Sequence, residues 1–301
     1  MNLKSYQNGN VFVTIDTDTG WKSRVTLDDE FIPNFAECCD VHISDKCDNG
    51  CAFCYAGCTK SGSHGNLLDW KFMDNLHPWT EMAINIQNPA PLELPEFLHR
   101  MKQKNIIVNA TVNQNHFMKD SFYEMIMAFQ KEGLIHGIGI SLTKPTKEFI
   151  ERVKQTPNSI VHVINGIVLG SELYALANHG INVLILGYKM TGRGSDYHSE
   201  VVELKKHSLY WRLKDIIANG WFDKLCFDNL ALEQLKPQRF LTDEEWSISY
   251  QGDDGTSTFF INLVDGTFGK NSLTSKEERY PIGDKSIDEM FKIILKEGGD
   301  K

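Results

Sequence analysis

The sequence predicts an α/β fold, a full or partial parallel barrel with an N-terminal lead-in and a small C-terminal α+β cap. Three observations predict it. Short β-branched runs alternate with amphipathic stretches from about residue 41 to 228, an isolated alternating run, VFVTIDTD, stands at 11–18, and the strand-helix pattern stops near residue 230. We therefore expect three regions, residues 1–37, 38–230 and 231–301.

The alternating run at 11–18 predicts a strand or hairpin arm in the lead-in. The strands expected in the central region are 41–44, 82–87, 105–112, 137–142, 160–169, 182–187 and 224–228. The helices expected between them are at about 68–80, 92–104, 118–132, 145–155, 171–179 and 200–219. Such repetition gives parallel strands with right-handed crossovers, and a parallel barrel binds its ligands at the C-terminal ends of the strands.

The region after residue 230 follows a different pattern. It contains a strand-like pair at 257–266 and an amphipathic closing helix at 285–297. We expect an appended α+β segment that covers the central region.

Composition excludes several classes of protein. The 301 residues are 41% hydrophobic and 24% charged, which is ordinary for a globular chain. No run approaches the roughly 18 apolar residues of a membrane helix, and the start, MNLKSYQNGN, lacks a signal-peptide layout, so we expect a cytoplasmic protein with no membrane contact. The charge of 31 − 40 = −9 argues against nucleic acid as a partner.

Cysteine is unevenly distributed. Six of the seven cysteines fall between residues 38 and 58, and Cys47, Cys51 and Cys54 among them have the spacing C-x3-C-x2-C. Three thiolates on one loop can bind three irons of an iron–sulfur cluster and leave the fourth iron open. The alternatives are a structural zinc site formed by these three with Cys58, and disulfides, which a reducing compartment disfavours. Cys38, Cys39 and Cys58 receive no role, and we expect a single cluster.

The segment Cys47-Asp-Asn-Gly-Cys51-Ala-Phe-Cys54 resembles the signature of the radical S-adenosylmethionine (SAM) superfamily, C-x3-C-x-φ-C. The resemblance implies a partial (β/α)6 barrel, a [4Fe–4S] cluster on these three cysteines, and SAM bound at the fourth iron. It also implies cleavage of SAM to a 5′-deoxyadenosyl radical that abstracts a substrate hydrogen. Phe53 and Tyr55 would contact SAM, and flavodoxin or ferredoxin would supply the electron.

Other strand ends resemble the family's SAM-binding positions. Asn88 lies in IQNP, where the family has G-G-E-P, and Asn113 lies in TVNQN, at the end of the third strand. Ser141 and Asn165 follow at strands four and five, and Lys189 and Arg193 lie in the glycine-rich loop LGYKMTGRGS. The alternative is that these side chains satisfy strand-end backbone groups or form a solvated turn.

Cys226 and Asp228 share one face of the seventh strand because side chains alternate along a strand. A thiol beside a substrate radical could return a hydrogen atom, as in radical SAM peptide epimerases, so we predict these two as catalytic residues. The alternative for Cys226 is inert core packing. The C-terminal segment loosely resembles the SPASM extension of peptide-modifying members, without its auxiliary cluster cysteines.

We therefore predict a radical SAM enzyme that acts on a peptide or protein residue. A nucleoside or another small-molecule metabolite is the alternative substrate. A non-enzymatic protein with a four-cysteine zinc site is the competing class.

Overall fold

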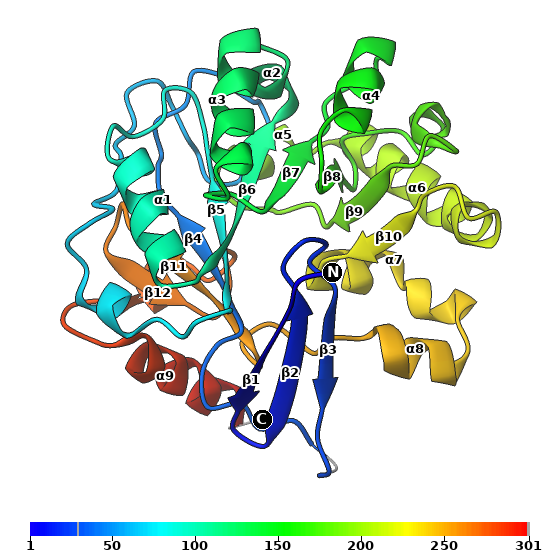
Figure 1. Cartoon of the computed structure of the whole chain (residues 1–301). Helices are drawn as coiled ribbons and strands as arrows, with labels where there is room; N and C mark the ends of the chain where they lie inside the picture. Colours follow the sequence, from blue (N-terminus) through cyan, green and yellow to red (C-terminus); the bar gives the residue numbers. More distant parts are fainter. Residues whose placement is uncertain (29, 300–301) are drawn as a thin grey trace.

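The computed structural model describes residues 1–28 and 30–299. The chain folds as a mixed α/β protein with two sheets (Figure 1). The larger sheet has the order β10-β9-β8-β7-β6-β5-β4-β11-β12-β13, and the smaller sheet has the order β1-β2-β3. Neighbouring strands from β10 across to β11 are parallel, so the α/β class and the parallel sheet predicted from the sequence are confirmed.

The predicted parallel strands are found within a few residues of their expected positions. They are β4 (Cys38–His42), β5 (Glu81–Asn85), β6 (Ile107–Asn113), β7 (Gly137–Ser141), β8 (Ser159–Ile164), β9 (Asn182–Leu186) and β10 (Lys224–Phe227). The first of them begins at Cys38 rather than at residue 41. Cys38 and Cys39 therefore belong to a strand, and only the later cysteines lie in the loop that follows it.

Helices cover the outer face of the larger sheet (Figure 1). The α-helices are α1 (Leu94–Gln103), α2 (Gln114–Phe117), α3 (Asp120–Lys131), α4 (Lys147–Lys154), α5 (Arg193–Tyr197), α6 (Glu200–Ala218), α7 (Asn229–Leu235), α8 (Asp243–Ser249) and α9 (Ile287–Gly299). Apolar side chains of these helices, such as Phe97 and Phe149, are fully buried in one core with outward-facing strand residues such as Val108. No helix in the described ranges is long and apolar enough to span a membrane.

Two predicted helices are wrong. The segments expected at 68–80 and 171–179 contain only the 3₁₀ helices Lys71–Asn75 and Glu172–Leu176, and two more 3₁₀ helices occur at Pro237–Phe240 and Lys276–Glu278. Pro78 and the left-handed Trp79 (φ 69°) prevent a longer helix in the first segment. In the second segment, Asn178 is left-handed (φ 60°) and ends the helix early.

The N-terminal lead-in forms a complete antiparallel sheet of β1 (Leu3–Asn8), β2 (Val11–Asp16) and β3 (Lys22–Val25), which confirms the predicted strand at 11–18. The turn between β2 and β3 brings Thr17, Thr19 and Gly20 to the cavity described below. Lys22 forms ion pairs with Glu37 and with Glu81 at the start of β5. These buried charges join the small sheet to the N-terminal ends of the parallel strands.

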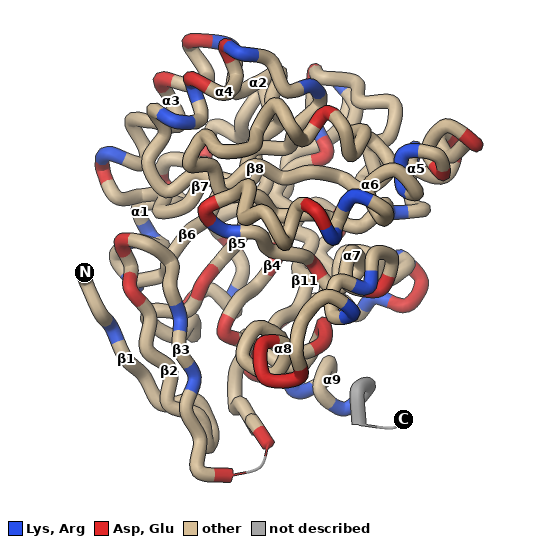
Figure 2. The backbone as a smooth tube through the Cα atoms, turned by 90° about the vertical axis from the view of Figure 1, so that its right-hand side faces the viewer, with Lys and Arg blue, Asp and Glu red and all other residues tan. Residues whose placement is uncertain are grey.

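The C-terminal segment becomes part of the larger sheet. Its first strand, β11 (Thr258–Asn262), pairs in parallel with β4, and β12 (Thr267–Gly269) and β13 (Tyr280–Pro281) continue the sheet in antiparallel order. The helix predicted at 285–297 is confirmed as α9. Acidic residues gather at the start of α8, while both signs of charge are interspersed elsewhere along the chain (Figure 2).

Candidate active site

The loop after β4 carries the three cysteines of the predicted cluster. Backbone hydrogen bonds close it at its base, from Cys47 N to Thr59 O (2.8 Å), from Thr59 N to Asp45 O (2.9 Å) and from Asp45 N to Ser63 O (2.9 Å). Gly50 has φ 63°, a conformation that glycine adopts without strain. The loop therefore projects the thiols from the C-terminal end of the first parallel strand.

The three thiols are partly buried and free. Burial raises the pKa of Cys51, and the neighbouring Cys54 and Cys47 raise it further. Burial likewise raises the pKa of Cys47, and Cys54 adds to this shift. Because each thiol acts electrostatically on the others, the three residues form one local group.

Cys54 differs from the other two. A hydrogen bond from the Cys58 thiol, together with the Arg193 charge, lowers the pKa of Cys54 to about 6 despite its burial. The same hydrogen bond, with burial, raises the pKa of Cys58. Cys58 is buried beneath the loop and contacts one member of the group as a thiol donor.

The donor set fits an iron–sulfur cluster better than a zinc ion. Within residues 1–28 and 30–299, the only group of three His, Cys, Asp or Glu ligand atoms that all lie within 4.8 Å of one another is His42, Asp45 and Cys58. Four thiolates around one zinc, with Zn–S near 2.3 Å, would lie about 3.8 Å apart. The loop cysteines do not converge in this way, whereas in a cubane cluster each sulfur binds a different iron and the sulfurs lie further apart.

Arg193 holds the cysteine loop in place. Its Nε donates to Cys51 O (2.9 Å) and its Nη1 donates to Cys58 O (2.9 Å), while its backbone N–H donates to Cys54 O (3.0 Å). A Cβ at Gly192 would lie 2.4 Å from Tyr55 O, so glycine allows the close approach of the two loops. The predicted glycine-rich loop therefore packs directly on the cysteine loop.

Asp48 links the cysteine loop to the ends of two neighbouring strands. Its carboxylate accepts hydrogen bonds from Asn88 Nδ2, from His116 Nε2 (2.6 Å) and from Lys119 Nζ (3.2 Å). These contacts outweigh partial desolvation and lower the pKa of Asp48 to about 2. The backbone O of Asn88 also accepts a hydrogen bond from Asp48 N (2.9 Å). Asn88 therefore contacts the cysteine loop through both its side chain and its backbone.

Asn113 and Asn49 approach Cys51. Asn49 Nδ2 donates to Cys51 Sγ at 2.9 Å, and Asn113 Nδ2 points to the same sulfur at 3.8 Å. Asn113 also begins α2, since its Oδ1 accepts from Asn115 N (2.8 Å). Hydrogen bonds to a ligating sulfur are a general means of tuning an iron–sulfur cluster.

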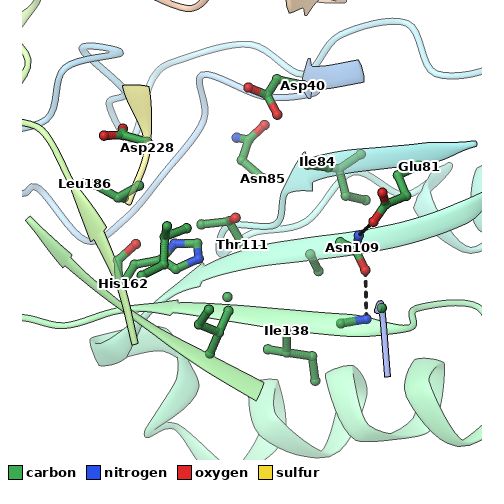
Figure 3. A pocket seen from close by; sticks show the side chains of 18 of the residues that line it. Asp40, Glu81, Ile84, Asn85, Asn109, Thr111, Ile138, His162, Leu186 and Asp228 are labelled. Carbon is green, nitrogen blue, oxygen red and sulfur yellow. Dashed lines mark hydrogen bonds between the residues drawn. The ribbon is translucent and has the colours of Figure 1, made fainter. Parts of the chain in front are cut away.

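A cavity of about 630 Å³ occupies the concave face of the larger sheet, beside the cysteine loop (Figure 3). This volume lies in the range of small-molecule sites. Alternate residues of the parallel strands line it, because side chains of period two face the same side of a sheet. The polar lining residues in mid-strand or at strand ends include Asp40, Asn85, Thr111, Ser141, His162 and Asp228, and the loops add Phe53, Tyr55 and Lys189.

Lys189 is held at the mouth of this cavity. Its Nζ donates to Ser272 Oγ (2.8 Å) and lies 4.1 Å from the centre of the Tyr55 ring. Phe53, on the same loop as Tyr55, packs its ring against the edge of Tyr197 (5.8 Å between centroids). The two aromatic residues of the cysteine loop therefore form part of the cavity wall.

Burial shifts the titration of three lining side chains. It raises the pKa of Asp40 and of Asp228, and it lowers the pKa of His162 to about 4 with a further contribution from Lys189. The Asp40 side chain lines the cavity. Water in the cavity can therefore reach its carboxylate, although protein surrounds that space. His162 is 8% exposed and neutral at pH 7.

The structure brings some of the sequence-predicted residues together and separates others. Phe53, Tyr55, Ser141, Lys189 and Asp228 line the cavity. Cys226 lies on the same strand face as the lining residues Lys224 and Asp228, although it is not itself in the lining. Asn88, Asn113 and Arg193 contact the cysteine loop instead, as described above.

Asn165 lies behind the cavity wall. It is 1% exposed, and its Nδ2 donates to Gln234 Oε1 (2.9 Å) on α7. Gln234 in turn pairs with the backbone of Tyr188 through both ends of its amide. Asn165 is therefore in contact with α7 rather than with the cavity.

Sequence reasoning missed Asp40, Thr111 and His162. The signal that could have found them is the polar side chain at every second position of a strand, as in Asp40 and His42 of β4. His162 interrupts the apolar run IVHVI of β8 in the same way. A polar residue that faces inward on a strand buried on both sides needs a ligand or a partner.

Comparisons with known proteins give a likeness of fold. No protein-family model matches the chain, and no curated protein matches it. A crystal structure of SuiB from Streptococcus suis is similar, with a TM-score of 0.62 and 12% identity over 96% of this chain and 87% of that chain.

Two further structures of the same protein are also similar. SuiB bound to S-adenosylmethionine has a TM-score of 0.61 and 12% identity, over 96% of this chain and 86% of that chain. SuiB bound to the precursor peptide SuiA has a TM-score of 0.61 and 11% identity, over 96% and 87%. The chain therefore has the fold of SuiB.

Proposed function

We propose that this protein is a radical SAM enzyme whose Cys47, Cys51 and Cys54 hold one [4Fe–4S] cluster, on a partial (β/α)6 barrel formed by residues 38–230. The observation that carries the proposal is one group of three thiols, on a loop at the C-terminal end of the first parallel strand and beside a cavity. When bound, the cluster and SAM supply the 5′-deoxyadenosyl radical that abstracts a substrate hydrogen. Flavodoxin or ferredoxin is the proposed electron donor.

The surrounding residues have positioning roles in this proposal. Arg193 binds the carbonyl groups of Cys51 and Cys58, and Asp48 holds the other side of the loop through Asn88 and His116. Phe53 and Tyr55 would form the wall against which the adenine of SAM packs, with Lys189 holding the Tyr55 ring. Asn113 and Ser141 would offer hydrogen bonds to the polar groups of SAM, and Asn165 supports this wall from behind through Gln234.

We propose a peptide substrate that presents a single side chain to the cavity. The likeness to SuiB bound to a precursor peptide supports a peptide. The volume of about 630 Å³ supports one side chain together with SAM, because it matches a small-molecule site rather than an extended groove. The C-terminal segment, 231–301, is the proposed cap of this barrel, and within it Asp254 joins Asn229 to Asn271.

Cys226 and Asp228 are the proposed catalytic residues on β10. Cys226 lies on the cavity side of the strand, and burial raises the pKa of its thiol, so it stays protonated at neutral pH. Its S–H bond would break as a C–H bond forms on the substrate radical, and the external electron donor and a proton would restore the resulting thiyl group. Asp228, on the same face, would orient the substrate.

The proposal is tested by replacing each loop cysteine. Cys47→Ala, Cys51→Ala and Cys54→Ala should each abolish reductive SAM cleavage after anaerobic reconstitution, measured as 5′-deoxyadenosine by liquid chromatography. Cys39→Ala is the matched control, because Cys39 is a buried thiol of β4 that packs in the core, and it should retain cleavage. Iron and sulfide analysis should give about four of each per chain. Zinc without iron, or cleavage that survives loss of a loop cysteine, would refute the proposal.

A further inference from the structure

Three side chains on the concave face of the larger sheet have polar atoms without a hydrogen-bond partner among the described residues. Neither oxygen of Asp40 has a hydrogen bond or ion pair within the described ranges. Asp228 Oδ1 accepts from Gly187 N (2.9 Å) and Ala231 N (2.7 Å), but its Oδ2 has no partner there. His162 is 8% exposed, and its Nδ1 is buried without a partner.

These groups face one space. Asp40 comes from β4, His162 from β8 and Asp228 from the end of β10, and all three line the same cavity (Figure 3). The figure shows the side chains of Asp40 and His162 directed toward its interior. Asp40 is exposed and Asp228 is half-buried, so water can reach their free oxygens, whereas the unpartnered atom of His162 is buried. A buried polar atom without a partner costs free energy, so His162 beside two carboxylates with free oxygens indicates a ligand that supplies donors.

The negative charge of the cavity favours a positively charged ligand. Burial raises the pKa of both Asp40 and Asp228, Lys189 lowers both, Asp254 raises both, and Asp228 also raises that of Asp40. Two lysines line the cavity, Lys189 and Lys224, and Lys189 is already bound to Ser272 and to the Tyr55 ring. A negative ligand group would meet two carboxylates, whereas a positive group would form charge-assisted hydrogen bonds with them.

A metal ion fits these positions poorly. In the part of the chain that the structure describes, only His42, Asp45 and Cys58 bring three ligand atoms within 4.8 Å of one another. Asp40, His162 and Asp228 therefore do not converge on one point. Apolar residues such as Ile138, Leu184 and Leu186 also line the cavity. A larger organic cation with an aliphatic part matches this mixture of surfaces.

We infer that the cavity recognises a basic side chain of the substrate, an ammonium or guanidinium group on an aliphatic stem, through Asp40 and Asp228 with His162 as a further hydrogen-bonding partner. This inference rests on the proposed function, because it names the residue that the peptide would present. Lysine-like and arginine-like side chains share the required chemistry, and the probes below distinguish them.

The test uses the reconstituted full-length protein, saturated with SAM, and four small probes. These are Nα-acetyl-lysine methylamide and Nα-acetyl-arginine methylamide, with Nα-acetyl-norleucine methylamide and Nα-acetyl-citrulline methylamide as their neutral counterparts. Isothermal titration calorimetry should show that one or both basic probes bind at least tenfold more tightly than the matched neutral probe. Equal affinity within each pair would overturn the inference. So would displacement of SAM by the basic probe, since the carboxylates would then serve the cofactor.

Two isosteric variants locate the effect. Asp40→Asn should reduce the preference for the basic probe at least fivefold, while Asp215→Asn, on the exposed side of α6, should leave it unchanged. If Asp40→Asn does not fold, Asp228→Asn replaces it, because an asparagine oxygen can still cap α7. An unchanged preference in a folded variant contradicts the inference.

The outcome is separable from that of the proposed function. A protein that cleaves SAM without discriminating between the probes refutes the basic-side-chain inference alone. A protein that discriminates between them but binds no iron–sulfur cluster refutes the proposed enzyme.

Discussion

Gly139 has no side chain, and the ring of His162 occupies the space beside it. A Cβ built on Gly139 would lie 2.3 Å from His162 Cε1 and 2.4 Å from Nε2, much closer than nonbonded atoms approach. The two residues are inward-facing neighbours on β7 and β8. A strand glycine often marks such a close approach.

Gly139→Ala should therefore destabilise the protein by about 1–3 kcal/mol through overpacking. In the background of His162→Ala most of this cost should disappear, because the clashing ring is absent. A double-mutant cycle from urea unfolding measures both. Equal costs in the two backgrounds would contradict the assigned contact.

The depressed pKa of His162 makes stability depend on pH. Because this pKa falls from 6.5 to about 4 on folding, only the unfolded chain takes up the proton between these values, and the folded state loses stability as the pH drops. Between pH 7 and pH 5 the loss from this residue should be about 2 kcal/mol. His162→Gln should remove that part of the pH dependence in urea titrations, and His207→Gln, on exposed α6, should not.

At the scale of elements, one carboxylate joins two segments that are far apart in the sheet order. Asp254 Oδ1 accepts from Asn229 Nδ2 (2.8 Å) at the start of α7, and its Oδ2 accepts from Asn271 Nδ2 (2.7 Å) just after β12. The helix α7 follows β10, whereas β12 lies at the other end of the sheet. Asp254 therefore links the two ends of the curved sheet.

Asp254→Ala should loosen this link at a cost of about 2 kcal/mol, the typical worth of hydrogen bonds to a charged group. Amide hydrogen exchange should accelerate in residues 229–235 and 267–273, with α3 unaffected. Asp284→Ala, at an exposed carboxylate, should change neither segment. Uniform acceleration across the chain would indicate global destabilisation instead.

Elements with a clear periodicity were predictable from the sequence, and those set by distant contacts were not. The parallel strands follow from β-branched runs, and α6 follows from 19 residues without Gly or Pro. The position of β11 beside β4 had no local signal, because pairing across more than 200 residues depends on the whole sheet. Because β11 pairs with β4, the segment that we expected to be an appendage is part of the larger sheet.

The site shows the same division. The cysteine loop was predictable because its three cysteines lie close together in the sequence. Asp228 was predictable because side chains alternate along the strand from Cys226. Asp40 and His162 could not be placed together, since they meet only when β4 and β8 curve around one cavity. The engagement of Arg193 with the cysteine carbonyls also depends on a contact across more than 130 residues.

At the scale of the whole molecule, the ion pairs of the largely buried Lys22 side chain join the two sheets. Its side chain is 13% exposed and pairs with Glu37, 2% exposed, and with Glu81, 17% exposed. Arg24 Nε also pairs with Glu37 at 2.8 Å, so that carboxylate keeps one partner if Lys22 is lost. Among the described residues, Lys22 is the only cation that forms an ion pair with Glu81.

Lys22→Met should cost about 3–5 kcal/mol, because it leaves a buried carboxylate without its cation. The double variant Lys22→Met with Glu81→Gln should recover part of the loss. Both are measured by chemical denaturation, with Lys131→Met at an exposed helix end as the control. A larger loss in the double variant than in the single one would show that the pair is not the cause.

Strand β11 is synthesised long after its partner β4, and this order affects folding during translation. During translation, one edge of β4 has no neighbour until residues 258–262 leave the ribosome, about 220 residues after β4 itself. An open strand edge beside a group of free thiols is prone to wrong pairing and oxidation. Insertion of the proposed iron–sulfur cluster into the loop after β4 is therefore expected to follow completion of the chain, and nascent chains that end before residue 257 should aggregate.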